Sequence, residues 1–232
     1  GHRFGIALGL RYRALVLTDI GRIVDAVENA EEALRLSRQL GSAEDTLSTL
    51  IMLLRSRLVR GDGAEIMPTL DEALAMVDMA DAEGFQPILH VWRARFLAKS
   101  GDLDEARAAI VEALRAPSRQ WPHQKARLQL NLARAYEQLG EDKRALDCAE
   151  AGLRLADACG FRYYAMRARQ VLSRVQPDEV ARGRHLRVAS ALARSLAAGM
   201  PRADMERFLD HQGVKRRTRP RLGLVSEKPG PR

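Results

Sequence analysis

Residues 131–153 read NLARAYEQLGEDKRALDCAEAGL, and this stretch decides the fold. Apolar side chains recur every three or four residues on both sides of Gly140, which indicates two amphipathic helices joined by a tight turn. Small residues stand where two antiparallel helices have to approach closely, at Ala133, Ala145 and Gly152. The stretch therefore predicts a helical hairpin that turns at Gly140.

The same pattern occurs three more times upstream. The turn glycines follow one another at intervals of 40, 40 and 39 residues, at Gly21, Gly61, Gly101 and Gly140. Small or apolar residues recur seven before each glycine (Ala14, Leu54, Ala94, Ala133), five after (Ala26, Ile66, Ala106, Ala145), twelve after (Ala33, Ala73, Ala113, Gly152) and thirteen after (Leu34, Leu74, Leu114, Leu153). Three of the second helices end in stop signals, at Leu40-Gly41, Glu83-Gly84 and Cys159-Gly160. One hairpin cannot bury its apolar faces alone, so the period predicts a stack of hairpins.

These residues resemble the tetratricopeptide repeat family over roughly residues 7–157. The resemblance is clearest in the quoted stretch and in Gly101-Asp102 with Ala106 and Ala113. It implies an all-α fold, an α-solenoid of stacked antiparallel hairpins. The chain departs from the family in its period, which is about 40 residues instead of 34, and in lacking most of the Trp and Pro anchors. This long-period variant resembles arrays in bacterial signalling proteins, such as maltose-activator-like regulators and large serine/threonine kinases with an ATPase segment.

The pattern predicts three parts along the chain. Residues 1–160 hold four repeats, at about 7–41, 43–84, 87–117 and 122–160, the third ending at Pro117. Residues 161–212 are predicted to form a degenerate fifth repeat and a C-terminal cap, because no turn glycine follows the helix expected at Phe161–Val175. Residues 213–232 are rich in proline and basic side chains and are predicted to be disordered. The first helix, at about residues 6–20, has no preceding repeat and is expected to expose apolar surface and fray.

Composition excludes several classes of protein. No apolar run approaches the roughly 20 residues that span a bilayer, and no phosphate-binding loop, kinase loop or His-Glu-x-x-His pair occurs. The sequence therefore predicts no catalytic residue, no metal site, no cofactor and no membrane span. The two cysteines, Cys148 and Cys159, are predicted to be free thiols, which fits a reducing cytoplasm. The net charge of +8 comes mainly from residues 213–232, which hold seven basic side chains and one acidic one.

The helical phase of the first helices gives the candidate site. One stripe of each helix must face the second helix, and the opposite stripe should face outward. In the family this side lines a concave groove that binds partner peptides. The residues expected there nine positions before each turn glycine are Tyr12, Met52, Trp92 and Asn131. Six positions before the second, third and fourth glycines stand Arg55, Arg95 and Arg134. The fifth repeat is expected to add Arg169.

A row of arginines beside aromatic side chains would suit a protein or peptide partner that carries carboxylates. Because the arginines are expected at the surface, reversing the charge of Arg95 and Arg134 should change stability by only about 0.5 kcal/mol. Two other interpretations stay open. The row can arise by chance in an arginine-rich chain, and Met52 or Trp92 can simply pack neighbouring repeats together.

The leading functional hypothesis is a non-catalytic protein-interaction or sensor scaffold, the C-terminal part of a larger bacterial signalling or transcription-regulatory protein. The first alternative is a receptor array in which a small molecule or peptide switches an upstream effector domain. The second is nucleic-acid binding through the tail, by Lys215, Arg216, Arg217, Arg219 and Arg221. A solvated tail is favoured over this second alternative, because no helix-turn-helix reader follows the array. The oligomeric state is left open.

Overall fold

A computed structural model describes residues 2–116 and 121–214, without the side chain of residue 78. Across these two ranges the chain forms eleven α-helices and a short 3-10 helix, with no β-strand, so the predicted all-α fold class is confirmed. None of the described helices is long and apolar enough to cross a bilayer. The break expected at Pro117 and the basic tail, with Lys215, Arg216, Arg217, Arg219 and Arg221, lie outside the described residues.

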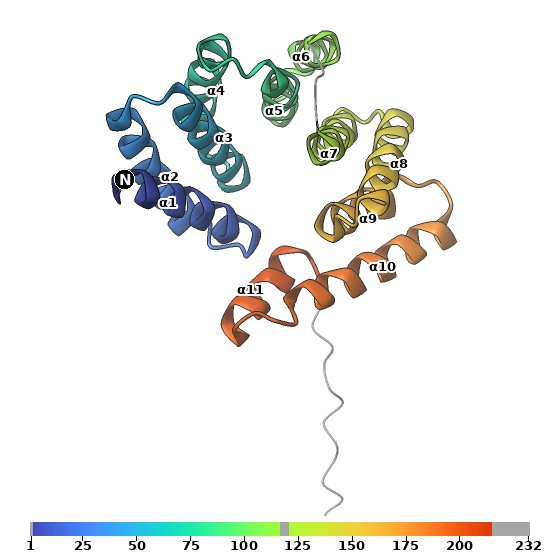
Figure 1. The fold of residues 1–232 in the computed structure, drawn as a ribbon. Helices are drawn as coiled ribbons and strands as arrows, with labels where there is room; N and C mark the ends of the chain where they lie inside the picture. Colours follow the sequence, from blue (N-terminus) through green and yellow to red (C-terminus); the bar gives the residue numbers. More distant parts are fainter. Residues whose placement is uncertain (1, 117–120, 215–232) are drawn as a thin grey trace, which may run out of the picture.

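The helices pair into hairpins that curve into a ring (Figure 1). The first helices line the inside of the ring and are α1 (His2–Asp19), α3 (Ala43–Arg60), α5 (Gln86–Ser100), α7 (Pro122–Gln138) and α9 (Arg162–Val175). Each of these contacts the next along the row. The remaining helices are α2 (Ile23–Leu40), α4 (Gly63–Met79), α6 (Leu103–Arg115), α8 (Asp142–Ala158), α10 (Glu179–Ala197) and α11 (Arg202–His211). The stacked-hairpin architecture therefore follows the predicted order.

The predicted turn glycines close the first helices. Gly61 ends α3 and Gly101 ends α5, with φ of 89° and 94° in the left-handed region that favours glycine. At Gly61 the backbone N–H donates to the carbonyl of Arg57 at 2.7 Å, which satisfies a group that the helix end leaves free. The stop predicted at Glu83-Gly84 is wrong. There α4 already ends at Met79, the non-glycine Asp81 takes the positive φ (48°), and Glu83–Phe85 forms the 3-10 helix η1.

Small residues occupy the close helix crossings, as the repeat pattern predicts. A Cβ atom built on Gly152 of α8 would lie 3.5 Å from the backbone nitrogen of Leu130 in α7. Ala106 and Ala145, five residues after the turn glycines of the third and fourth hairpins, are fully buried. The repeated leucine is less uniform, because Leu114 is 61% exposed on the outer helix α6.

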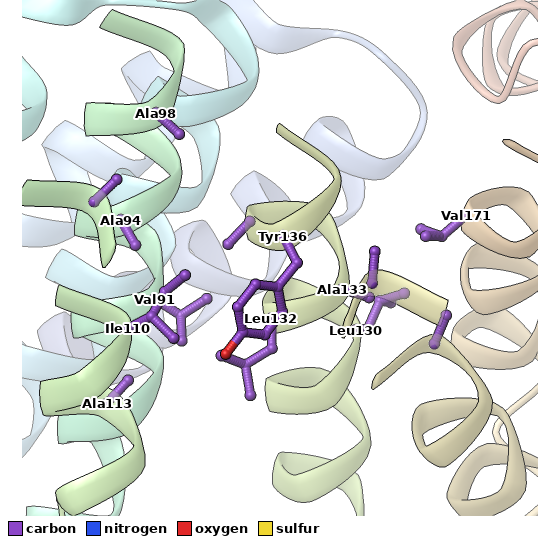
Figure 2. Close-up of a cluster of buried hydrophobic side chains, with 14 of the residues drawn as sticks. Val91, Ala94, Ala98, Ile110, Ala113, Leu130, Leu132, Ala133, Tyr136 and Val171 are labelled. Atoms are coloured by element: carbon purple, nitrogen blue, oxygen red, sulfur yellow. The ribbon is translucent and has the colours of Figure 1, made fainter. Parts of the chain in front are cut away.

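The centre of the array has a continuous apolar core (Figure 2). Leu132 and Tyr136 of α7 point toward Val91 and Ile110 of the third hairpin, while Ala133 lies on the side of α7 that faces α9. Inner helices therefore pack on both neighbouring hairpins, as in a solenoid.

The C-terminal cap closes the ring onto the first hairpin. Leu17 of α1 and Ile20, just after that helix, share an apolar cluster with Phe208 of α11 and with Val214. The cap thus extends two residues into the segment predicted to be disordered, since Val214 is only 7% exposed. The predicted exposure of apolar surface on the first helix is present along much of its length, at Phe4 (47% exposed), Tyr12 (57%) and Val16 (56%). One face of its last turn is covered, at Leu17, because the curvature of the array brings the last helices against it (Figure 1).

Candidate functional site

A cavity of about 160 Å³ opens on the inside of the ring, and we call it the arginine pocket. Five arginines from four consecutive inner helices line it, namely Arg55, Arg95, Arg127, Arg134 and Arg167. The remaining lining residues are Leu15, Thr18, Asp19, Met52, Leu58, Val59, Trp92, Leu130, Asn131, Tyr163, Tyr164 and His211. Five cations therefore face one carboxylate, that of Asp19.

The repeat places three of these arginines where the helical phase predicts them. Arg55, Arg95 and Arg134 occupy the same turn of α3, α5 and α7, six residues before the turn glycine. Arg127 lies two turns earlier on α7, on the same face as Arg134. Its position seven residues before Arg134 on the same helix could have predicted its place, because seven residues are nearly two helical turns.

The fifth arginine is Arg167 and not the expected Arg169. Arg169 lies outside the pocket and contacts Asp157 of α8 at 3.4 Å. No turn glycine follows α9, so its sequence does not anchor the register of the helix, and the arginine equivalent to Arg134 lies two residues before Arg169. Arg167 follows Tyr163 by four residues, as Arg134 follows Leu130 on α7. A shift of two residues turns a side chain to nearly the opposite face of a helix, which explains the error.

Arg55 is the one arginine in the pocket that pairs with a described carboxylate. Its guanidinium forms a short ion pair with Asp19, and both side chains are 26% exposed. The hydroxyl of Tyr163 donates to the same Asp19 oxygen at 2.8 Å. Burial works against the charged form of Arg55, but the Asp19 carboxylate together with Tyr163 and Tyr164 outweighs it and raises the pKa of Arg55. Asp19 thus neutralises one edge of the pocket.

Three of the other arginines lack such a partner. No acidic side chain in the described part of the chain forms an ion pair with Arg95, Arg127 or Arg134. The Nε atoms of Arg95 and Arg127 are buried and have no hydrogen-bond partner among the described residues. Arg95 donates through Nη1 to the side-chain oxygen of Asn131 at 2.8 Å, which is a neutral acceptor. These cations therefore lie partly desolvated and without an ion-pair partner among the described residues.

The pKa values of the pocket arginines reflect the same excess of positive charge. Burial, followed by the positive charge of Arg167, lowers the pKa of Arg95 to about 10. Burial, followed by the charges of Arg95 and Arg167, lowers the pKa of Arg134 well below its ordinary value. Glu137 acts on Arg95 in the opposite direction, but its carboxylate is already paired with Arg174, with Nη2 and Oε2 2.9 Å apart. Arg95 and Arg134 thus repel each other and Arg167 across a small cavity.

The predicted aromatic anchors have different roles. Trp92 is only 3% exposed, and its Nε1 donates to Asn131 at 3.3 Å, so it packs between repeats and forms the pocket wall. Tyr12 is 57% exposed and lines a neighbouring groove of about 280 Å³, which shares Leu15, Met52 and Arg127 with the arginine pocket. The arginines that are expected at the surface are half-buried, because curvature turns these side chains toward one another.

Comparison with known families identifies one hairpin of the ring. Residues 126–159 match the tetratricopeptide repeat. The matched segment covers most of α7 and all of α8, and it supplies Arg127, Asn131 and Arg134 to the pocket. No curated protein sequence matches the chain. The family resemblance of the fourth repeat is thus confirmed, and this repeat is the one that contributes most charge to the arginine pocket.

Proposed function

We propose that this chain is a protein-interaction scaffold whose arginine pocket holds an acidic segment of a partner protein. The single observation that carries the proposal is the set of desolvated guanidinium groups in the pocket, at Arg95, Arg127 and Arg134, that form no ion pair with a described carboxylate. The tetratricopeptide repeat at residues 126–159 supports a protein as the partner.

The charge of the pocket favours an acidic partner for energetic reasons. A desolvated cation without a counter-charge lowers the stability of the fold, and a carboxylate from a partner restores the missing interaction. Guanidinium groups bind carboxylates through paired N–H donors, which gives both affinity and orientation. Residues that lower stability and yet gather in one cavity are typical of a binding site.

The dimensions of the pocket limit what enters it. A cavity of about 160 Å³ takes acidic side chains or a chain terminus and leaves no room for a helix. The adjoining groove beside Tyr12 and Met52 offers an apolar surface for the neighbouring residues of an extended segment. The proposed ligand is therefore an extended peptide with acidic and apolar residues side by side.

The broader context belongs to the same proposal. The scaffold would comprise four repeats within residues 1–160 and a fifth repeat with the cap within residues 161–212, in a cytoplasmic signalling or transcription-regulatory protein. A receptor array that switches an effector domain would use the same pocket. Nucleic-acid binding through the tail is the separate alternative, and it predicts binding that the pocket arginines do not affect.

A peptide-binding experiment tests the proposal. Fluorescence anisotropy would compare a labelled hexaglutamate peptide with a hexaglutamine peptide on the wild-type chain. We expect binding of the glutamate peptide alone, and at least a tenfold weaker affinity when Arg95→Gln and Arg134→Gln are combined. The matched control combines Arg13→Gln and Arg154→Gln, which remove two exposed arginines outside the pocket. Equal losses in the two double variants would mean that the total charge of the chain, and not the pocket, binds the peptide.

A further inference from the structure

Within the arginine pocket, one group of arginines has a geometry of its own. Arg95, Arg134 and Arg167 come from three consecutive inner helices, α5, α7 and α9, and line the same cavity. Asp19 cannot serve them, because it is taken up by Arg55 and Tyr163. The hydrogen bonds of the group go to neutral acceptors, from Arg95 to Asn131 at 2.8 Å and from Arg167 to Gln212 at 2.7 Å. We call this group the arginine triad.

We infer that the arginine triad is a binding site for a phosphoryl group, a compact dianion that contacts all three guanidinium groups at once. The inference rests on the proposed function and names the chemistry of its ligand. It concerns a phosphorylated side chain of the partner or a free phosphate, since both present the same group to the triad.

Charge and shape both favour a phosphoryl group over a carboxylate. A carboxylate is planar, carries one charge and matches one guanidinium fork. A phosphoryl group carries a charge of about −1.5 to −2 at neutral pH and three strong acceptor oxygens that point in different directions. Three arginines from three helices line one cavity, so each can donate to a different oxygen of the phosphoryl group, and their combined charge exceeds what one carboxylate can neutralise.

The size and the walls of the cavity fit the same ligand. At about 160 Å³ the pocket is smaller than the roughly 300–1,000 Å³ of sites for drug-sized molecules. Apart from the arginines, Thr18, Asp19, Asn131, Tyr163, Tyr164 and His211 bring polar atoms to its wall, so the cavity is not an apolar void that a hydrophobic side chain would fill. Arg134 comes from α7, which packs between α5 and α9, so it stands on the middle one of the three helices.

Two kinds of probe test the inference on the full chain. The first is inorganic phosphate against acetate, at matched ionic strength with chloride, read as a shift in melting temperature. The second is a labelled hexaglutamate peptide against the same peptide with one phosphoserine at its centre, read by anisotropy. We expect the phosphopeptide to bind at least tenfold more tightly than hexaglutamate. Free phosphate should raise the melting temperature more than acetate if it binds without a peptide.

Variants separate a fitted site from general charge attraction. Arg134→Lys keeps the charge but loses the fork, and we expect it to remove most of the preference for phosphoserine. Arg154→Gln, an exposed position on α8, should leave that preference unchanged. If the phosphopeptide is preferred over hexaglutamate while free phosphate acts like acetate, the phosphoryl group that the site binds belongs to a phosphorylated side chain of the partner.

The inference is overturned if phosphoserine brings no gain over glutamate and phosphate acts like acetate. In that case binding of hexaglutamate that is lost with Arg95→Gln and Arg134→Gln would still support the proposed function. If neither the preference for a phosphoryl group nor pocket-dependent binding of hexaglutamate is found, the inference and the proposed function are both overturned.

Discussion

Tyr163 donates a 2.8 Å hydrogen bond to Asp19, a residue 144 positions earlier in the chain. This contact joins the first inner helix to the last one and closes the ring beside the arginine pocket. Gln212, just after α11, adds a bond from its side-chain nitrogen to the carbonyl of Asp19 at 3.3 Å. Asp19 therefore serves the closure of the ring and the neutralisation of Arg55 at the same time.

Asp19→Asn is expected to loosen this closure. The substitution leaves Arg55 without a counter-charge and weakens the bond to Tyr163. Because both charged side chains are about a quarter exposed, we expect a loss of about 1–2 kcal/mol in the free energy of unfolding. Circular dichroism melts measure this loss of stability. The control is Asp104→Asn, which removes a fully exposed carboxylate on α6. Identical melting of Asp19→Asn and the wild type would mean that the contact contributes nothing to closure.

Arg134→Met is expected to stabilise the free protein. The change removes a desolvated cation that Arg95 and Arg167 repel, and it keeps most of the side-chain volume. We expect a gain of about 1 kcal/mol, or roughly 2–4 °C in melting temperature for a chain of this size, together with loss of anion binding. Thermal melts without ligand measure the gain. A lower melting temperature would show that Arg134 supports the fold, against the account given for the pocket.

His211 should make the closure sensitive to acid. Burial, Arg167, Arg134 and Arg55 lower the pKa of His211, and Asp19 opposes them, so the net shift is downward. The folded state then binds the proton less readily than the unfolded state. Stability is therefore complete above the ordinary pKa of about 6.5 and declines as the pH falls below it. His90 and His185 shift in the same direction, so the measurement is the difference between His211→Gln and the wild type from pH 7.5 to 5. We expect a flatter profile for the variant; parallel profiles would exclude a role for His211.

Ala106→Leu tests the close packing of the hairpins. Ala106 is fully buried where α5 and α6 cross, and a larger side chain has to push the helices apart. We expect a cost of about 1–3 kcal/mol. Ala108→Leu, exposed on the same helix, is the matched control and should change stability little. Similar melting temperatures for the two variants would contradict the close crossing.

The sequence pattern predicts the hairpins and most of the inner row because both depend on local periodicity. The turn at Gly140 and the small residues around it determine which face of α7 is inner, and Arg134 follows from that phase. The choice of Arg169 over Arg167 fails because α9 has no turn glycine to fix its register. A periodic apolar pattern shows which face of a helix is buried. The register of that helix relative to the other repeats needs an anchor of its own, such as a turn glycine, in every repeat.

Closure and burial could not be predicted in this way. Whether Asp19 meets Tyr163 depends on the summed curvature of five hairpins, and a small rotation at each step decides it. The same curvature turns Arg95 and Arg134 toward each other, so charge reversal there is no longer the nearly neutral surface change that the sequence alone predicts. Val214 is another case, since its burial against the cap depends on where the ring closes.

The most direct test of the arginine pocket is nuclear magnetic resonance of the arginine Nε–H groups during titration with the hexaglutamate peptide or its phosphoserine form. The Nε atoms of Arg95 and Arg127 are buried without a partner among the described residues, so an anion that enters the pocket has to change their surroundings. We predict that the resonances of Arg95, Arg127, Arg134 and Arg167 shift together and saturate, while those of the exposed Arg13 and Arg154 stay in place. Shifts confined to exposed arginines, with the pocket resonances unmoved at saturating peptide, would contradict the assignment of this cavity as the binding site.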